Sequence, residues 1–496
     1  PSILLIWVFI RDCKSYFMED YKFKTLPYEH QREAFVLSSN KKDYALLMDM
    51  GTGKTKVCLD SIGFLFEKKE IDLALIVAPK GVIANWLGEI ETHLPERIER
   101  EIVLWKPSLT KSFREQLKKL GQPSNKLKFL LMNVEAFSSK KGVEVAEYFI
   151  KNSKAFMAID ESTTIKNRQA KRTKSISKLG LGARYKRILT GSPITKSPLD
   201  LYSQMNFLNE KILGFNSFYA FQARFAVVQR RTMGTHSFNQ IVGFRRLDEL
   251  TTILENNSYR VRKEDCLDLP DKVYVRRDVE MTPEQVKAYD QMKHFALAKL
   301  KNGELATTKN ALTQIMRLQQ ICCGNLTDDD GVVHSLPSNR IKELVDICGE
   351  IQGKAIIWAT WTADIRSIAE ALRDCFSVQA VATLHGETPV SDRQKIVEDF
   401  QDRQSELRFI VGHPKTGGYG LTLTAAKTVI YYSNSYDLEL RLQSEDRAHR
   451  IGQTNKVTYI DLISPKTIDE KIVKALRSKI NIADTIMGEG ARDWLV

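Results

Sequence analysis

The sequence predicts an α/β protein with two lobes, each built around a parallel sheet, and a helical segment between them. Short apolar runs bounded by turn residues alternate with helical patterns in both halves of the chain. Such alternation is typical of parallel sheets that are covered by helices on both faces. The chain has 496 residues. Because single hydrophobic cores stop growing at roughly 250 to 300 residues, we expect more than one core.

The expected strands fall into two groups. The first group is 44–48, 73–77, 127–132, 156–159 and 187–189, and the second is 355–358, 378–382, 409–411, 429–432 and 457–462. Between the groups, 283–300 and 311–321 have the periodicity of helices. We therefore predict a first lobe over 18–212, a helical insertion and linker over 213–330, and a second lobe with C-terminal helices over 331–496.

The first residues and the cysteines indicate the cellular location of the protein. The apolar run 3–10 is too short for a membrane helix, and it lacks both a preceding basic region and a small-residue cleavage site. Seven scattered cysteines form no metal-ligand spacing and no disulfide framework. We expect reduced thiols, no membrane partner and an intracellular location, cytoplasmic or, in a eukaryote, nuclear.

Residues 1–17 are expected to lie outside the folded lobes. The chain begins with Pro1, and Met18 is followed at once by charged sequence that leads to the first motif. We expect this extension, either added in preparing the protein or derived from upstream sequence, to be dispensable for activity.

The charge of the chain favours a polyanionic partner. Lysine and arginine total 74 against 61 acidic residues, which gives a formal net charge of +13. Basic residues bind nucleic acid by neutralising phosphates and releasing counterions. A solvated basic surface is the alternative interpretation of the charge.

The segment 48–55, MDMGTGKT, predicts a phosphate-binding loop. It follows an expected strand and opens a helical pattern, which is the context that a P-loop requires. Its backbone NH groups and the helix N-terminus attract phosphate. Lys54 is expected to reach the β and γ phosphates of ATP, and the Thr55 hydroxyl is expected to join the coordination shell of Mg²⁺. The residues expected to bind nucleotide here are Met50, Gly51, Thr52, Gly53, Lys54 and Thr55. Met48 replaces the first glycine of the general pattern, and a chance glycine turn is the alternative.

Two acids, Asp160 and Glu161, end the apolar run 156–159. Adjacent carboxylates at the end of a strand can divide the work, with Asp160 holding Mg²⁺ through water and Glu161 polarising the attacking water. A solvated turn is the alternative for an isolated pair. The P-loop about a hundred residues upstream favours the catalytic interpretation.

The segment 443–453, QSEDRAHRIGQ, resembles motif VI of Swi/Snf-type ATPases of helicase superfamily two almost residue for residue. Arginine is always charged and presents a planar fork that suits phosphate oxygens. The resemblance implies that Arg447 and Arg450 are arginine fingers for the transferring phosphoryl group. An exposed helix rich in ion pairs is the alternative, and it does not explain eleven residues in this order.

Further segments are similar to motifs of the same family, from about residue 25 to about residue 475. Gln31 resembles the glutamine that reads adenine ahead of the P-loop. The other similar segments are 76–90 (motif Ia), 160–167 (the acidic box), 189–208 (motif III and its helix), 259–272 (an arginine-rich passage), 354–361 (motif IV), 384–388 and 417–432 (motif V). Ser162 and Thr163 replace the usual Ala-His, and Thr422 replaces a common asparagine, so the contacts made by those family residues are in doubt.

The resemblance implies two RecA-like lobes that close on one ATP and move along duplex DNA. It implies phosphate contacts to DNA near Pro79 and Lys80 and near Gly418 and Gly420, with binding that is independent of base sequence and sensitive to salt. Residues expected to couple DNA contact to hydrolysis are Gly191, Ser192 and Gln443, although Gly191 and Ser192 also fit a simple turn before Pro193. We expect the protein to be a monomer that remodels forks or junctions or displaces proteins from DNA. Binding of a protein partner of unknown identity is also left open.

Two other functions remain open at this point. The first is a conventional helicase that separates strands, since it shares the ATP machinery. The second is a DNA-binding scaffold with weak ATPase activity, against which the presence of Lys54, Asp160, Glu161, Arg447 and Arg450 argues. The phenylalanines at 215, 218, 221 and 225 have helical spacing, which favours the core face of a helix over a base-stacking platform.

Overall fold

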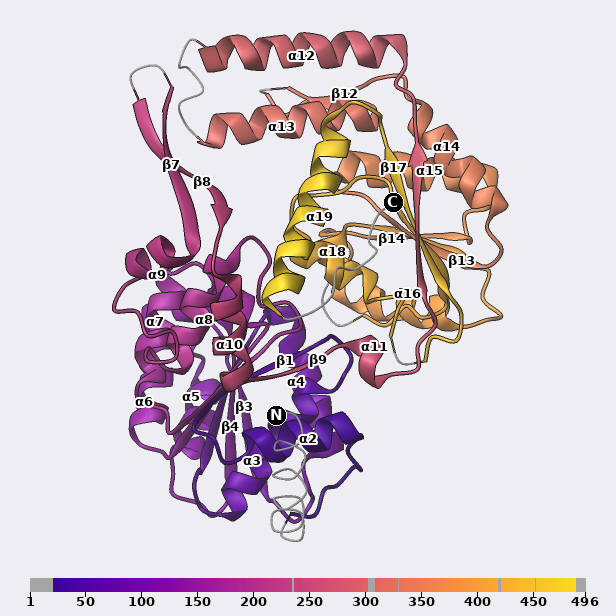
Figure 1. The fold of residues 1–496 in the computed structure, drawn as a ribbon. Coiled ribbons are helices and arrows are strands. Elements are labelled where there is room, and N and C mark those ends of the chain that lie inside the picture. Colours follow the sequence, from indigo (N-terminus) through magenta and orange to yellow (C-terminus); the bar gives the residue numbers. More distant parts are fainter. Residues whose placement is uncertain are drawn as a thin grey trace. The chain divides into compact units, whose positions relative to one another are not determined.

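The computed structural model describes residues 21–233, 236–301, 308–328, 330–417, 421–450 and 452–487. The chain divides into two compact units, whose main segments are the residues up to Phe225 with Phe244–Leu267, and Ala226–Gly243 with Asp268–Asp484 (Figure 1). The expected extension 1–17 and the glycines Gly418 and Gly420 lie outside the described residues.

The first unit is built on a parallel sheet with the strand order β3-β4-β2-β5-β6-β1-β9. Its strands are β1 Asp43–Met48, β2 Leu73–Ala78, β3 Arg100–Leu104, β4 Leu127–Asn133, β5 Ala155–Asp160, β6 Tyr185–Leu189 and β9 Ser258–Val261. All six residues of β2 and of β5 are buried, as expected for strands that are covered on both faces.

Helices lie on both faces of this sheet (Figure 1). The helices of the first unit are α2 Glu29–Ser38, α3 Lys54–Glu67, α4 Lys80–His93, α5 Lys111–Leu120, α6 Lys140–Lys151, α7 Lys171–Gly180, α8 Leu201–Leu208, α9 Phe218–Phe225, α10 Leu247–Asn257 and α11 Lys263–Cys266. The short 3₁₀ turns are η1 Val134–Ser138, η2 Ser162–Ile165 and η3 Pro198–Asp200. One core joins Leu46 of β1 to Leu59 of α3 and Trp86 of α4. On α9, Phe221 and Phe225 are fully buried, which confirms the predicted core face for these two residues. Phe218 is half-buried, as is Phe215, which precedes the helix.

The second unit contains a parallel sheet with the order β10-β17-β16-β13-β15-β14. Its strands are β10 Lys272–Asp278, β13 Lys354–Trp358, β14 Val381–Leu384, β15 Phe409–Gly412, β16 Ala426–Tyr431 and β17 Val457–Ile463. Successive strand residues point to opposite faces, so Ile356 joins one core cluster and Ile357 joins the other. Both faces are therefore buried, and the prediction of two α/β lobes with parallel sheets is confirmed.

The helices of the second unit are α12 Pro283–Lys301, α13 Thr308–Cys323, α14 Asn339–Glu350, α15 Thr362–Cys375, α16 Val390–Gln401, α17 Pro414–Gly417, α18 Leu438–Glu445 and α19 Ile468–Ile486. Two further sheets have two strands each: β7 Ala226–Met233 pairs with β8 His236–Phe244, and β11 Asn325–Thr327 pairs with β12 Val333–Ser335. The helices expected at 283–300 and 311–321 correspond to α12 and α13.

The segment 213–330 differs from the helical insertion that the sequence predicted. Its strand β9 pairs with β1 and belongs to the first sheet, and its strand β10 pairs with β17 and belongs to the second. The boundaries drawn at 212 and 330 therefore do not match the sheets. Strand β9 has only four residues, and the side chains of β10 are partly or fully exposed. Neither strand therefore produces the long apolar run by which buried strands are recognised.

In the parallel sheets, reliance on apolar runs also missed one strand and shifted the start of another. The edge strand β3 was not predicted, because its residues are mostly half-buried. Strand β14 begins at Val381, whereas the apolar run suggested a start at Val378, which is 67% exposed.

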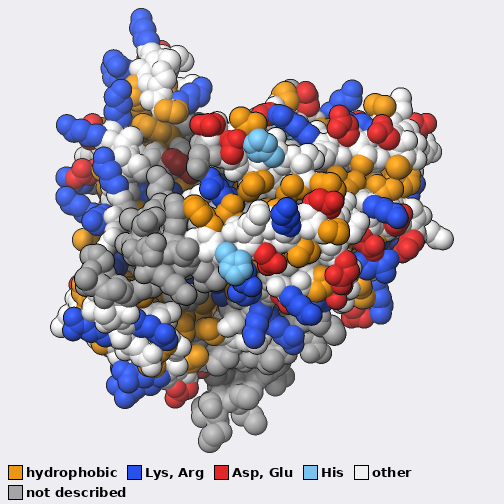
Figure 2. Space-filling view, turned by 90° about the horizontal axis from the view of Figure 1, so that it is seen from above, with side chains coloured by type: hydrophobic (Ala, Val, Ile, Leu, Met, Phe, Trp, Pro, Cys, Tyr) orange, Lys and Arg blue, Asp and Glu red, His pale blue; other side chains and the backbone are white. Residues whose placement is uncertain are grey.

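Charge is spread unevenly over the surface. Figure 2 shows one face on which Lys and Arg side chains gather toward the left edge, whereas Asp and Glu side chains are more frequent on the right. Among the residues described, no helix combines the length and the apolar character needed to cross a membrane.

Candidate ATP site and its coupling residues

Four strands of the first sheet have the expected site residues at or after their carboxyl ends. Strands β1 and β5 both flank β6, so that Leu46 and Asp160 lie in register with Leu189. Because the strands are parallel, the segments that follow them emerge at one edge of the sheet. The P-loop follows β1, the acidic pair ends β5, Gly191 and Ser192 follow β6, Pro79 follows β2, and the arginine-rich passage includes β9.

The P-loop has the backbone that its glycines allow. Gly51 and Gly53 have φ angles of +79° and +90°, in the left-handed region that favours glycine. The Thr52 hydroxyl donates to the Asp49 carbonyl at 2.7 Å. Helix α3 begins at Lys54, whose ammonium group donates to the Asp49 carbonyl at 3.2 Å. Lys54 and Thr55 are thus the first two residues of the helix, where NH groups face a phosphate.

Gln31 contacts the P-loop itself. Its amide nitrogen donates to the Thr52 carbonyl at 3.0 Å, and its amide oxygen accepts from the Tyr28 NH at 3.1 Å. A Cβ added to Gly53 would lie 2.2 Å from the Gln31 amide nitrogen. Gln31 therefore supports the turn of the P-loop. His30, to which the sequence gave no role, contacts the same Thr52 carbonyl at 2.8 Å.

The Asp160 carboxylate is buried and held by two donors. The Trp86 indole NH donates to one oxygen at 2.9 Å, and the Glu161 NH donates to the other at 2.9 Å. Burial raises the pKa of Asp160, while the positive charge of Lys54 and the Trp86 hydrogen bond oppose that rise. A carboxylate that burial disfavours in its charged form is stabilised by a bound cation. The Asp160 carboxylate and the Thr55 hydroxyl both offer oxygen atoms, and Mg²⁺ takes oxygen ligands while it keeps several waters.

Glu161 stands at a strained position directly after β5. Its φ is +49°, a conformation that residues other than glycine rarely adopt. Such strain concentrates at functional sites because the surrounding structure must support it. Glu161 is half-buried, so its carboxylate retains access to water at this edge of the sheet.

The turn after β6 packs directly on the P-loop. A Cβ added to Gly191 would lie 3.1 Å from the Met50 nitrogen and 3.3 Å from the Asp49 Cα. Arg260 of β9 fixes both segments, because its guanidinium donates to the carbonyls of Gly191 and Leu47 and pairs with Asp49 at 2.9 Å. Glycine at 191 is therefore required by close packing, beyond its ability to make a turn.

A second link joins the acidic box to the segment after β6, and sequence reasoning missed it. The Ser162 hydroxyl donates to the Gln204 side-chain oxygen at 2.7 Å, and the Gln204 amide donates to the Pro193 carbonyl at 2.8 Å. Ser162 and Gln204 are both fully buried. Nearby, Lys166 donates to the Thr195 hydroxyl at 2.7 Å. The only sequence signal was the departure from Ala at 162.

Pro79 and Lys80 begin helix α4 at the same edge. Pro79 is the N-cap residue, and the Lys80 side chain is exposed. The helix N-terminus adds a partial positive charge to that of Lys80. Trp86, which holds Asp160, lies on the same helix. A ligand that moves α4 would therefore act on the acidic pair.

In the second unit, both expected arginine fingers contact one carbonyl. Arg447 and Arg450 donate to the Leu421 carbonyl at 3.3 and 3.2 Å. Arg450 also donates to the Thr422 hydroxyl at 3.1 Å. The threonine that replaces the family's common asparagine therefore still contacts a motif VI arginine. Gln443, the third expected residue of this segment, accepts from the Arg447 Nε through its carbonyl at 3.1 Å.

Helix α18, which precedes the arginines, is held by buried charges. Arg441 donates to Glu445 at 2.8 Å and to both oxygens of Asp461 on β17. Burial alone would raise the pKa of Glu445, but the charges of Lys272 and Arg441 outweigh it and lower the pKa to about 2. The helix is thus fixed to the sheet immediately before the arginines begin.

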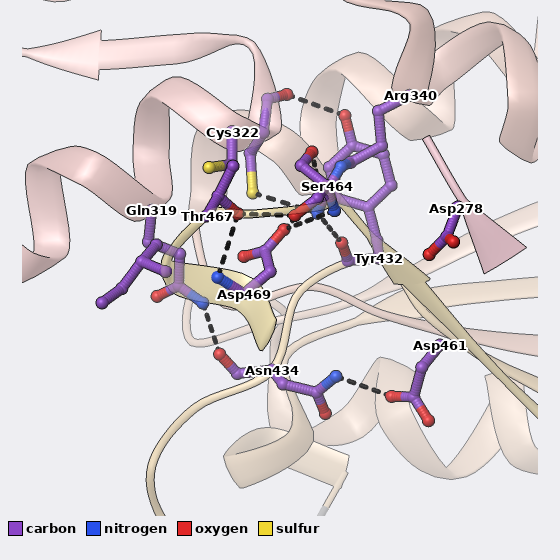
Figure 3. A network of polar contacts seen from close by, with 12 residues as sticks. Asp278, Gln319, Cys322, Arg340, Tyr432, Asn434, Asp461, Ser464, Thr467 and Asp469 are labelled. Carbon is purple, nitrogen blue, oxygen red and sulfur yellow. Dashed lines mark hydrogen bonds and ion pairs between the residues drawn. The ribbon is translucent and has the colours of Figure 1, made fainter. Parts of the chain in front are cut away.

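A neighbouring network extends this support to other helices of the second unit. Asn434 donates to Asp461 at 2.6 Å and accepts from Gln319 of α13 (Figure 3). Arg340 of α14 pairs with Asp469 of α19 and donates to the Tyr432 carbonyl at 2.7 Å (Figure 3). Arg340 is fully buried. Breaking a buried pair of this kind costs about 3 to 5 kcal/mol, so we expect the network to hold α14 and α19 rigidly to the sheet.

Two profiles of known families match the chain. One, described as "SNF2-related domain", matches residues 28–326, and the other, "Helicase conserved C-terminal domain", matches residues 339–452.

Individual proteins are similar over most of the chain. The SWI/SNF chromatin-remodeling complex subunit snf22 of Schizosaccharomyces pombe is 27% identical over 96% of this chain and 28% of its own length. An uncharacterized ATP-dependent helicase of Mycoplasma pneumoniae is 25% identical over 91% of this chain and 41% of its own length. A solved structure, the Sulfolobus solfataricus SWI2/SNF2 ATPase core in complex with double-stranded DNA, covers 94% of both chains at 24% identity with a TM-score of 0.42. The chain spans less than half the length of the two curated relatives.

Proposed function

The chain belongs to the SNF2-related family, and we propose that it is a translocase that couples ATP hydrolysis to movement along double-stranded DNA. The two matching profiles identify an ATP-hydrolysing enzyme. The observation that carries the proposal is the gathering of the P-loop, the acidic pair and the Gly191 turn at one sheet edge, where Arg260 joins the start of the P-loop to the Gly191 turn. Such links pass a change at the nucleotide to segments that can bind DNA.

Nucleotide binding is assigned to the first unit. The NH groups of the P-loop and Lys54 bind the phosphates, and Gln31 lies beside Gly53 where it can also contact the base. When bound, Mg²⁺ supplies positive charge to the phosphate oxygens, with Thr55 and Asp160 as its protein partners. Trp86 keeps the Asp160 carboxylate oriented. Glu161 orients the attacking water and accepts its proton.

Arg447 and Arg450 are assigned to the charge that develops on the transferring phosphoryl group. Their bonds to the Leu421 carbonyl have an uncharged acceptor, and a negatively charged phosphate oxygen is a stronger acceptor for a guanidinium. We expect the arginines to turn from that carbonyl to the nucleotide when ATP is bound. Because Leu421 and Thr422 follow Gly418 and Gly420, the exchange would alter the expected DNA-binding segment of motif V.

DNA contacts are assigned to phosphates. Lys80 and the N-terminus of α4 supply positive charge in the first unit, and the motif V glycines supply backbone NH groups in the second. The net charge of +13 and the uneven distribution of basic side chains in Figure 2 support a polyanionic partner. Binding should be independent of base sequence and should weaken steeply with salt.

The test combines ATPase and displacement assays. Duplex DNA should stimulate phosphate release, and Lys54→Ala should abolish it. The enzyme should displace the third strand of a triplex without unwinding a forked duplex. Efficient unwinding with no triplex displacement would instead identify a strand-separating helicase. Equal, negligible phosphate release by the wild type and Lys54→Ala would identify a DNA-binding scaffold.

A further inference from the structure

Strands β7 and β8 form a ribbon that no other strand joins in the described part of the chain (Figure 1). Only two residues separate the strands, and a connection of that length requires an antiparallel pair. The hydroxyls of Thr232 and Ser237 contact each other across the ribbon at 3.1 Å. At its base, the Arg245 NH donates to the Phe225 carbonyl at 2.9 Å.

In the described part of the ribbon beyond Ala226, both faces have exposed side chains. The six consecutive residues 227–232 are all exposed, and successive side chains of a strand point to opposite faces. On β8, Phe238 and Val242 are 46% and 41% exposed. Because an isolated two-stranded hairpin is marginally stable in water, a ribbon of this length gains stability from a partner.

The charge of the ribbon indicates the chemistry of that partner. Residues 226–246 contain four arginines and no aspartate or glutamate, although acidic residues make up 61 of the 496 residues of the chain. The arginines are Arg230, Arg231, Arg245 and Arg246. Arg230 and Arg231 form no ion pair within the described residues. A basic segment without internal acids is complementary to a polyanion.

We infer that this ribbon enters a groove of duplex DNA and contacts the phosphates on its two sides; the inference rests on the proposed function. Eight residues of strand span about 27 Å, and a major groove about 12 Å wide admits a two-stranded ribbon. Arg230 and Arg231 are adjacent, so their side chains leave opposite faces of the ribbon. Each faces one wall of the groove, and each wall carries the phosphates of one DNA strand. Phe238 and the exposed valines supply apolar contact with the sugars.

The double variant Arg230→Ala/Arg231→Ala tests the inference. Binding of a 30-base-pair duplex is measured by fluorescence anisotropy over a range of salt concentrations. Loss of two phosphate contacts should reduce the slope of log affinity against log salt concentration by about 2. The DNA concentration that gives half-maximal ATPase stimulation should rise about tenfold. The DNA-free ATPase rate should not change, because neither arginine belongs to the ATP site.

Two control variants separate phosphate contact from other effects. Lys118→Ala/Lys119→Ala removes the same charge from exposed positions on α5 and should leave the slope unchanged. Arg230→Lys/Arg231→Lys keeps the charge and should retain most of the slope. An unchanged slope in the alanine variant would overturn the inference, and loss of self-association in that variant would then assign the ribbon to contacts between copies of the chain. If the wild type hydrolyses ATP without stimulation by DNA but its DNA binding still depends on these arginines, the proposed function fails and the ribbon inference stands.

Discussion

Arg260 contacts three residues in two segments of the first unit with one guanidinium group, and the sequence gave it no individual role. It bonds the carbonyls of Leu47 and Gly191 and pairs with Asp49. Arg260→Ala would leave Asp49 beside the P-loop without this partner. We expect a loss of about 2 kcal/mol in the free energy of unfolding, because hydrogen bonds to charged groups contribute that much. A tenfold or larger fall in kcat, about 1.4 kcal/mol in the barrier, should accompany it.

Arg262→Ala is the matched control, since Arg262 lies two residues further along and pairs with Asp265 at the surface. Exposed pairs contribute at most about 1 kcal/mol. Thermal unfolding and steady-state ATPase rates of both variants should separate the two arginines. Equal effects would show that Arg260 has no special part in supporting the site.

Glu445 should make the second unit sensitive to acid. Its pKa is lowered from the usual 4.5 to about 2 by neighbouring positive charges that outweigh burial. A carboxyl whose pKa is lower in the folded state contributes stability that is present above its unfolded pKa and is lost as pH falls through the folded pKa. The contribution should therefore be complete above about pH 4.5 and disappear toward pH 2, with a size of about 3 kcal/mol.

Glu445→Gln tests this contribution. Urea unfolding at several pH values should show the variant to be less stable than the wild type at pH 7. The difference between the two proteins should shrink as pH falls from 4.5 toward 2. A difference that does not vary with pH would mean that Glu445 acts through its shape or its hydrogen bonds and not through its charge.

At the scale of elements, helix α8 joins the acidic box to the turn that follows β6. Gln204 of α8 accepts from Ser162 and donates to the Pro193 carbonyl, so the three segments should respond together. In a double-mutant cycle, Ser162→Ala and Gln204→Leu should show a coupling of about 1 kcal/mol in the barrier to DNA-stimulated hydrolysis. Additive effects would mean that the link does not transmit between the segments.

Gly191 gives a second prediction at this scale. Its missing side chain lets the turn lie against the backbone at Met50. Gly191→Ala should push the turn and the P-loop apart by a few tenths of an ångström and lower kcat about tenfold, since misplacement of about 1 Å can cost a hundredfold. Steady-state kinetics and nucleotide affinity test this, with Gly88→Ala on α4 as control because a Cβ there meets nothing within 4 Å. Normal kcat in Gly191→Ala would make Gly191 a simple turn residue.

The sequence predicted the elements that lie in the cores and missed those at the edges. Strands such as β2 and β5 are buried along their whole length and produce unbroken apolar runs. Strands β3, β9 and β10 are short or half-exposed. Apolar periodicity cannot detect such strands, because it reports burial and not pairing.

At the scale of the whole molecule, the candidate site was predicted as separate motifs and not as a connected structure. Once the strands are known, their parallel order predicts that the motif residues gather at the carboxyl edge of the sheet. The links through Ser162, Arg260 and Trp86 join residues that are 42, 69 and 74 positions apart. Sequence spacing contains no information about such contacts. Trp86, Ser162 and Arg260 could therefore be recognised as members of motifs, but their roles could not be predicted.

The division of the ATP machinery between two units leads to the last prediction. The P-loop and the acidic pair belong to the first unit, and Arg447 and Arg450 belong to the second. If ATP joins the units, then removing the arginines should leave nucleotide binding to the first unit nearly intact and abolish hydrolysis. Arg447→Ala and Arg450→Ala should each lower kcat by about 10³ to 10⁵, the range for arginine fingers.

Lys54→Ala provides the contrast, because it should lose binding and hydrolysis together. A fluorescent ATP analogue measures binding, and phosphate release in the presence of duplex DNA measures hydrolysis. Arg441→Ala is also informative, since Arg441 lies on α18 but is buried against Asp461. It should lower the thermal stability of the second unit more than either arginine-finger variant does, because it removes buried ion pairs to Glu445 and Asp461. Hydrolysis that survives the loss of both arginines would mean that the first unit completes the reaction alone, and movement of one unit against the other would then have no chemical cause.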